Sequence, residues 1–171
     1  MIQKKVCMLG GFAVGKTSLV ARFVHSLYSD RYQTTIGVKI DKKVLDVDGT
    51  ELALVLWDIA GEDEFHTVGP SYLRGMAGYL LVVDGMRRDT LATARELRSR
   101  VDQVVGSVPF VLLLNKHDRR DDWELGADDI ASLRGEGWTV MSASAKTGEN
   151  VEQAFLTLGR ALLGTHRTDH V

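Results

Sequence analysis

The chain has 171 residues, of which 44% are hydrophobic and 26% charged, as expected for one soluble globular domain. Its net charge of −2 gives no reason to expect a nucleic-acid partner, and a single cysteine, Cys7, excludes an internal disulfide. No apolar run has the length of a membrane span. Ile2 stands where myristoylation needs glycine, and no cysteine lies near the end for prenylation. We therefore expect a cytoplasmic protein without a lipid anchor.

Short apolar runs alternate along the chain with longer segments of helical periodicity. The expected strands are Lys5–Leu9, Val38–Val47, Leu52–Asp58, Gly78–Asp84, Phe110–Asn115 and Trp138–Ser142. The expected helices are Lys16–His25, Asp63–Leu73, Arg88–Val105, Ala127–Leu133 and Val151–Leu163.

Four of the expected strands are near-continuous apolar runs, which require cover on both faces, as in a parallel sheet between helices. Val38–Val47 is instead polar and charged, as in an exposed edge strand, and Asp48-Gly49 after it is typical of a hairpin turn. The sequence therefore predicts an α/β, doubly wound, six-stranded and mostly parallel sheet with one antiparallel edge strand and about five helices. We expect one domain over residues 1–164 and a short polar tail at 165–171, with the Cys7 thiol buried in the first strand.

The stretch Gly10–Thr17 between the first strand and the first helix has the pattern G-x-x-x-x-G-K-T of a phosphate-binding P-loop. Its backbone N–H groups and the following helix N-terminus form a concave anion site. Lys16 is expected to reach the β- and γ-phosphates and Thr17 to bind Mg²⁺, whereas the alternative for this motif alone is a glycine-rich turn with a solvated lysine. The nucleotide-binding residues expected here are Gly11, Phe12, Ala13, Val14, Gly15, Lys16, Thr17 and Ser18.

Two further loops are expected near the terminal phosphate. Thr34-Thr35 lies in a polar loop before the edge strand, where a threonine can bind Mg²⁺ and the γ-phosphate or simply lead into the strand. Asp58-Ile59-Ala60-Gly61 follows a buried strand as a D-x-x-G pattern. Asp58 is expected to hold a water on Mg²⁺, and the N–H of Gly61 to meet the terminal phosphate.

Two loops near the end of the sheet are expected to read the base. In the N-K-x-D motif Asn115-Lys116-His117-Asp118, the carboxylate of Asp118 accepts from two donors on one edge of guanine, whereas adenine presents a lone pair there. Lys116 is expected to lie along the base, and Asn115 to connect this loop to the P-loop. Ser144-Ala145-Lys146 follows the last strand, where the N–H of Ala145 is expected to meet guanine O6 with Lys146 packing nearby.

The order and spacing of these stretches resemble those of Ras-superfamily small GTPases, particularly the Rab and Ras branches, over essentially the whole chain. The resemblance implies that Thr35 rather than Thr34 is the switch threonine, that Tyr28 packs against guanine, and that Tyr32 covers the phosphates. It also implies a GTP/GDP switch in which Thr35 and Gly61 hold the γ-phosphate and release it after hydrolysis. Effectors, exchange factors and activating proteins would then bind through residues 30–40 and 60–75.

Two residues depart from the family pattern. Glu62 replaces the glutamine that usually orients the attacking water, and a carboxylate about 5 Å from a phosphate oxygen costs about 3 kcal/mol at an effective dielectric of about 20. We therefore expect slow hydrolysis. Phe12 stands where many relatives carry a small residue; its ring either crowds an arginine supplied by an activating protein or packs outward with little effect.

The sequence thus predicts a monomeric G domain that hydrolyses GTP to GDP and phosphate. The expected catalytic residues are Lys16, Thr35, Gly61 and Glu62, and the expected Mg²⁺ ligands are Thr17, Thr35 and Asp58. One alternative is a nucleotide-bound interaction module with little or no hydrolysis. A more distant one, a P-loop kinase of a small molecule, is disfavoured by the N-K-x-D motif.

Overall fold

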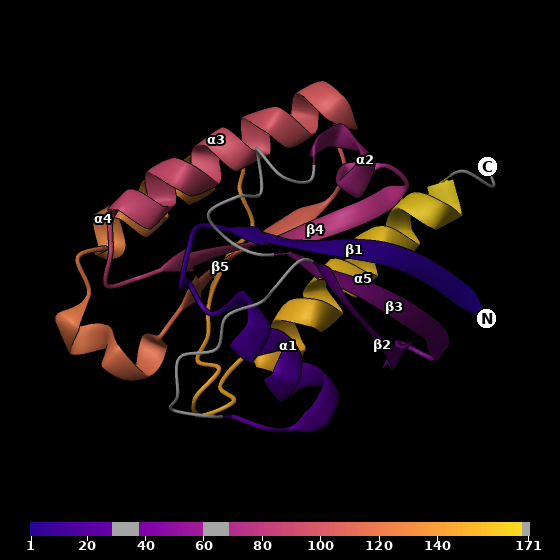
Figure 1. Cartoon of the computed structure of the whole chain (residues 1–171), viewed down its shortest axis with the longest axis horizontal. Coiled ribbons are helices and arrows are strands. Elements are labelled where there is room, and N and C mark those ends of the chain that lie inside the picture. Colours follow the sequence, from indigo (N-terminus) through magenta and orange to yellow (C-terminus); the bar gives the residue numbers. More distant parts are fainter. Residues whose placement is uncertain (29–37, 60–68, 169–171) are drawn as a thin grey trace.

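A computed structural model of the protein describes residues 1–28, 38–59 and 69–168, with side chains through Gly164. Figure 1 shows a central sheet between two layers of helices. The strands are β1 (Ile2–Gly10), β2 (Val38–Val47), β3 (Thr50–Ile59), β4 (Met76–Asp84), β5 (Phe110–Asn115) and β6 (Val140–Ser142). The helices are α1 (Lys16–His25), α2 (Gly69–Leu73), α3 (Asp89–Val104), the 3-10 helix η2 (His117–Asp122), α4 (Ala127–Gly135) and α5 (Val151–Thr168).

The sheet has the strand order β2-β3-β1-β4-β5-β6, and only the edge strand β2 runs antiparallel to its neighbour β3. This confirms the expected fold class. In a parallel sheet of this kind, ligands bind beyond the carboxyl ends of the strands. Strands β1, β5 and β6 lead into the P-loop, the N-K-x-D loop and the S-A-K loop, and β3 carries Asp58 of the D-x-x-G pattern near its end, so the fold gathers these motifs at one edge of the sheet.

Several element bounds differ from the sequence-based expectation. β1 begins at Ile2 rather than Lys5, because parallel pairing with β3 from Ile2 opposite Leu52 includes the polar residues that hydrophobicity alone leaves out. β6 begins at Val140 rather than Trp138, whose ring instead packs edge-on against Phe110 at 5.4 Å. Helix α5 continues beyond Leu163 to Thr168, within the stretch expected as a tail. Of the helix expected over 63–73, the structure describes the part that forms α2, and residues 63–68 lie outside the described residues.

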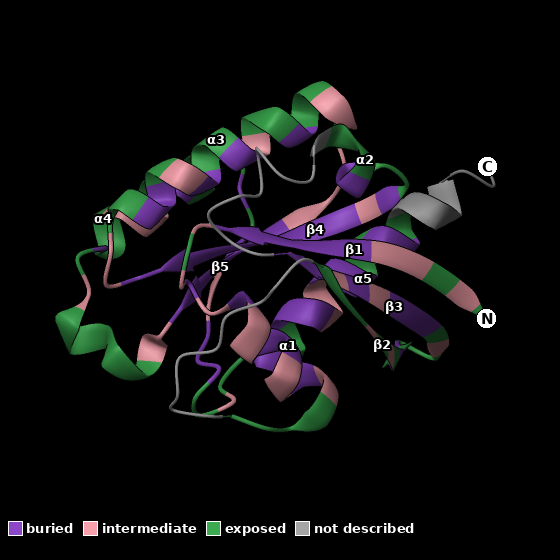
Figure 2. Ribbon diagram, viewed as in Figure 1, coloured by how far each residue is buried: buried purple, intermediate pink, exposed green. Residues whose placement is uncertain are grey.

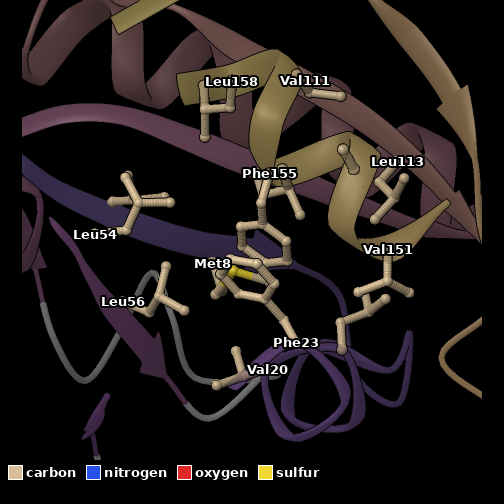
Figure 3. Close-up of a cluster of buried hydrophobic side chains, with 14 of the residues drawn as sticks. Met8, Val20, Phe23, Leu54, Leu56, Val111, Leu113, Val151, Phe155 and Leu158 are labelled. Carbon is tan, nitrogen blue, oxygen red and sulfur yellow. The ribbon is translucent and has the colours of Figure 1, made fainter. Parts of the chain in front are cut away.

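Two hydrophobic cores lie on opposite faces of the sheet, and the buried residues follow the strands through its centre (Figure 2). Successive strand residues alternate between the two cores, so Val6 and Met8 face α1 and α5, while Cys7 and Leu9 face α2, α3 and α4. On the α1–α5 side, Phe23 and Phe155 stack with ring centroids 3.8 Å apart (Figure 3). The stack joins the helix that follows the P-loop to the last helix of the chain.

The Cys7 thiol is fully buried, as the sequence predicted. Burial raises its pKa to about 12, despite the opposing charge of Lys5 and a contact with Tyr72. A thiol with this pKa is not a nucleophile at neutral pH, so Cys7 serves as a core residue.

Candidate functional site

The P-loop connects β1 to α1 and requires unusual backbone conformations. Gly15, which precedes α1, has φ of +102°, and Ala13 also has a positive φ of +59°. A Cβ on Gly15 would lie 2.3 Å from Nδ2 of Asn115. Glycine is therefore needed at this position both for its backbone angle and for the close approach of the N-K-x-D loop.

Lys16 lies in the first turn of α1 and is only 5% exposed. Its Nζ donates to the carbonyl of Gly10 at 3.3 Å and to that of Ile59 at 3.0 Å, at the ends of β1 and β3. Burial lowers the pKa of Lys16 to about 8, and the nearby charge of Asp58 only partly opposes this. The fold thus holds a cation in a poorly hydrated position, where an anion would stabilise its charge.

Thr17 and Asp58 place two oxygen atoms side by side, with Oγ1 of Thr17 donating to Oδ2 of Asp58 at 2.7 Å. A hydroxyl and one carboxylate are ligands that suit Mg²⁺, which usually keeps several waters and takes substrate phosphates as further ligands. Within the described ranges, no group of three or more His, Cys, Asp and Glu side chains is placed to hold a metal. The hydroxyl of Thr17 and the carboxylate of Asp58 fit a Mg²⁺ that is shared with phosphates.

The N-K-x-D loop after β5 contacts the P-loop directly, as expected for Asn115. The buried Asn115 donates from Nδ2 to the carbonyl of Val14 at 3.0 Å and accepts at Oδ1 from the N–H of Ala145 at 3.2 Å. Lys116 donates from Nζ to the carbonyl of Ala13 at 3.1 Å. These contacts connect three separate loops, so the P-loop, the N-K-x-D loop and the S-A-K loop lie together at one place in the fold.

Asp118 lies at the exposed end of this site and is oriented by Ser144. The fully buried Ser144 donates from Oγ to Oδ1 of Asp118 at 2.7 Å and accepts from the N–H of Thr147 at 3.1 Å. This fixes the carboxylate relative to the neighbouring Ala145. The serine of the S-A-K motif thereby orients the carboxylate of Asp118, a contact that the sequence pattern alone did not predict.

A second buried carboxylate, Asp84, was not predicted from the sequence as part of the site. It ends β4, is 1% exposed, and accepts at Oδ2 from Nζ of Lys116 at 2.8 Å and from Nε of Arg87 at 3.0 Å. Burial raises the pKa of Asp84, but hydrogen bonds from Lys116, the N–H of Met86 and Arg87 outweigh it, and the pKa lies below its usual value. The available signal was an aspartate directly after an apolar strand, the same signal that identified Asp58.

Arg87 also extends this network to the tip of the P-loop, where its Nη2 donates to the carbonyl of Phe12 at 2.7 Å. The Phe12 ring itself is 43% exposed. Arg22, on α1, donates to the carbonyls of Ala145 and Lys146. No sequence pattern pointed to either arginine.

The remaining expected site residues are only partly described. Tyr28, beyond the end of α1, is 39% exposed, and Lys146 is also exposed. Tyr32, Thr35, Gly61 and Glu62 lie outside the described residues. Of the two stretches expected to bind partner proteins, the structure describes residues 38–40 and 69–75.

This strand order, with a P-loop after β1, an N-K-x-D loop after β5 and an S-A-K loop after β6, defines the P-loop GTPase fold. Comparison with known sequences gives the same class. The sequence profile of the Ras family matches residues 5–164. The chain therefore belongs to the Ras family and is a small GTPase.

Three relatives illustrate the similarity. The chain is 34% identical to Ras-related protein RABD1 of Arabidopsis thaliana, over 90% of this chain and 76% of that protein. It is 32% identical to GTP-binding protein ypt2 of Schizosaccharomyces pombe, over 92% of this chain and 80% of that protein. Its identity to human Ras-related protein Rab-32 is 36%, over 96% of this chain and 76% of that protein. The expected resemblance to Ras and Rab proteins is thus confirmed.

Proposed function

We propose that this small GTPase is a slowly hydrolysing switch that reads guanine through Asp118 and senses the γ-phosphate through Thr35 and Gly61. The main support is the contact of the N-K-x-D loop with the P-loop, in which Asn115 and Lys116 donate to the carbonyls of Val14 and Ala13. Because these contacts connect the two ends of the site, one nucleotide bridging both would be held by a preformed frame.

The proposed catalytic roles are mostly positioning and charge stabilisation. Lys16 would neutralise phosphate charge, and Gly61 would donate its N–H to the γ-phosphate. Thr17 and Thr35 would hold Mg²⁺ directly and Asp58 through a water, and the ion would neutralise charge that develops on the phosphates. Glu62 would hold the water less effectively than glutamine, since an ionised carboxylate offers no donor.

The guanine reading predicts a change of base preference in Asp118→Ala. Without the carboxylate, guanine loses the acceptor for its N1–H and amino group, so competition assays should show a GDP-over-ADP preference reduced at least tenfold. Asp121→Ala, an exposed aspartate three residues later, is the matched control and should keep the preference. An unchanged preference in Asp118→Ala would refute the proposed base readout.

Hydrolysis separates the switch from the alternative of a nucleotide-bound interaction module. Glu62 and the exposed ring of Phe12 favour the module. The purified protein with excess GTP and Mg²⁺ should release phosphate over hours if it is a slow enzyme. No release above the protein-free rate would support the module.

Partners and location belong to the same proposal. Exchange factors, activating proteins and effectors would bind through residues 30–40 and 60–75, and we propose a monomer between these encounters. In the parts of the chain that the structure describes, no helix is both long and apolar enough to cross a membrane. A cytoplasmic location stays a prediction.

A further inference from the structure

We infer that Arg22 is a positioning residue for guanine discrimination, acting on the O6 edge of the base through the loop of Ala145. The inference rests on the proposed guanine readout and extends it to a residue outside the nucleotide-binding motifs. Arg22 lies on α1, whose first turn carries Lys16 and Thr17. Its contacts are with a loop 123 residues further along the chain.

The guanidinium of Arg22 binds two consecutive carbonyls of the S-A-K loop. Nε donates to the carbonyl of Ala145 at 2.8 Å, and Nη2 donates to that of Lys146. The planar fork of an arginine holds two acceptors at a fixed spacing, which a single ammonium group does not do. The stem is also close to the loop, since a Cβ on Gly148 would lie 3.7 Å from Cδ of Arg22.

The other supports of the S-A-K loop act elsewhere on it. The N–H of Ser144 donates to the carbonyl of Glu149 at 3.0 Å, and the N–H of Gly148 donates to the carbonyl of Ser144 at 2.8 Å, so both close the loop on itself. The N–H of Ala145 donates to Oδ1 of Asn115 at 3.2 Å. Arg22 therefore holds the carbonyl side of Ala145, opposite to its N–H, and attaches the loop to α1.

The two sides of the guanine edge thus have different supports. Asp118, which would bind N1–H and the amino group, is oriented by Ser144 Oγ at 2.7 Å. The N–H of Ala145, which donates to Oδ1 of Asn115 in this structure and would be shared with O6 of a bound guanine, belongs to the residue whose carbonyl Arg22 holds. Loss of Arg22 should therefore loosen recognition of O6 while leaving recognition of the amino group intact.

Nucleotide analogues that alter one edge group at a time distinguish these effects. In 6-thioguanosine diphosphate, sulfur replaces O6, and sulfur is a weak acceptor. Inosine diphosphate instead lacks the amino group. Affinities of the two analogues, GDP and ADP are measured by competition against a fluorescent guanosine diphosphate at pH 7, for the wild type and for Arg22→Met, which keeps an unbranched apolar stem. Arg160→Met is the control, because Arg160 is an exposed arginine that pairs with Asp48 at the β2–β3 turn.

In the wild type, the thio substitution should weaken binding about fivefold, as expected for one hydrogen bond. In Arg22→Met this penalty should fall below about twofold, while the inosine penalty stays within about twofold of wild type; Arg160→Met should match wild type in both. Arg22→Lys retains the positive charge but not the planar fork, so its thio penalty should lie between those of the wild type and Arg22→Met. This variant replaces Arg22→Met if Arg22→Met does not fold.

Three results would overturn the inference. An unchanged thio penalty in Arg22→Met, or in Arg22→Lys if that variant replaces it, would show that Arg22 does not act on O6. An equal fall of both penalties would show a general loosening of the site. Equal competition by ADP and GDP in the wild type would instead refute the proposed function, and the role of Arg22 with it.

Discussion

Lys16 holds its positive charge where water reaches it poorly, and it donates hydrogen bonds to the carbonyls of Gly10 and Ile59. Burial lowers its pKa from 10.5 to about 8, and the charge of Asp58 opposes this in part. In the protein without nucleotide, the folded state therefore binds fewer protons than the unfolded state between about pH 8 and 10.5. By linkage, stability should rise with pH across this window, whereas below it the cost of burying the charged lysine is fully present and Lys16 adds no pH dependence.

Nucleotide binding should reverse this shift, because phosphate charge favours the protonated lysine. With a pKa of about 8, Lys16 should take up about a tenth of a proton on binding GDP at pH 7 and about three quarters at pH 8.5. Calorimetric titration in buffers of different ionisation enthalpy measures this uptake. Lys16→Arg, a permanent cation, should show no such rise with pH. Equal uptake by the wild type at the two pH values would contradict the prediction.

Glu62 is the other residue whose charge should set a measurable rate. If its carboxylate repels the γ-phosphate and offers no donor to the attacking water, Glu62→Gln should accelerate single-turnover GTP hydrolysis at least tenfold. GDP affinity should change little, since GDP lacks the γ-phosphate. Asp128→Asn, an exposed acid-to-amide change on α4, is the control and should leave the rate unchanged. An unchanged rate in Glu62→Gln would show that the family glutamine position does not limit this chain.

At the scale of elements, local patterns located the strands and helices but not all of their ends. The bounds of β2, β5 and α1 follow from apolar runs, turn residues and the P-loop, and the structure reproduces them. The ends of β1 and β6 depend on pairing with neighbouring strands, which no local window contains. The 3-10 helix η2 was missed because His117–Asp122 is polar, and its end is held by Nε1 of Trp123 donating to the carbonyl of Lys116.

The same division applies to the site. Motifs after strands predict Lys16, Asn115 and Asp118 as site residues, because each proposed chemistry requires a residue type at a fixed offset. Arg22 and Asp84 are instead connected to the site by contacts with other parts of the chain, 123 and 32 residues away. Pairings over such separations depend on the finished fold, so a single sequence does not reveal them.

The junction between the P-loop and the N-K-x-D loop gives a test at this scale. Gly15→Ala would place a Cβ 2.3 Å from Nδ2 of Asn115, at a residue with φ of +102°. Asn115 must then move from the carbonyl of Val14, so GDP affinity should fall at least tenfold and the protein should be less stable.

Gly49→Ala is the matched control for this change. Gly49 has φ of +89°, and a Cβ at this position would meet nothing within 4 Å, so the substitution carries the backbone strain without the clash. It should lower the free energy of unfolding by about 1 kcal/mol and leave GDP affinity unchanged. Equal losses of GDP affinity in the two variants would refute the role assigned to the contact.

At the scale of the whole molecule, the nucleotide site depends on two cores that share one sheet. The core of α1 and α5 fixes the helix whose first turn carries Lys16 and Thr17, and the core of α3 and α4 supports β4 and β5. Because both cores use the same strands, we expect the molecule to unfold in one cooperative transition, with bound GDP raising its midpoint by mass action. A change in either core should then act on the stability of the whole domain.

Phe155 is the residue through which this coupling is best tested. It is fully buried on α5 and stacks on Phe23 of α1, so Phe155→Ala removes a large ring from the centre of that core. The free energy of unfolding should fall by about 3–5 kcal/mol, measured by denaturant titration without nucleotide. Leu27→Ala, at a residue that is 63% exposed beyond α1, should lower the free energy of unfolding by less than about 0.5 kcal/mol.

Folded Phe155→Ala should still prefer GDP to ADP, because Asp118 and Ser144 lie outside this core. A loss below about 1 kcal/mol, or two separate unfolding transitions, would contradict a single domain held together across the sheet.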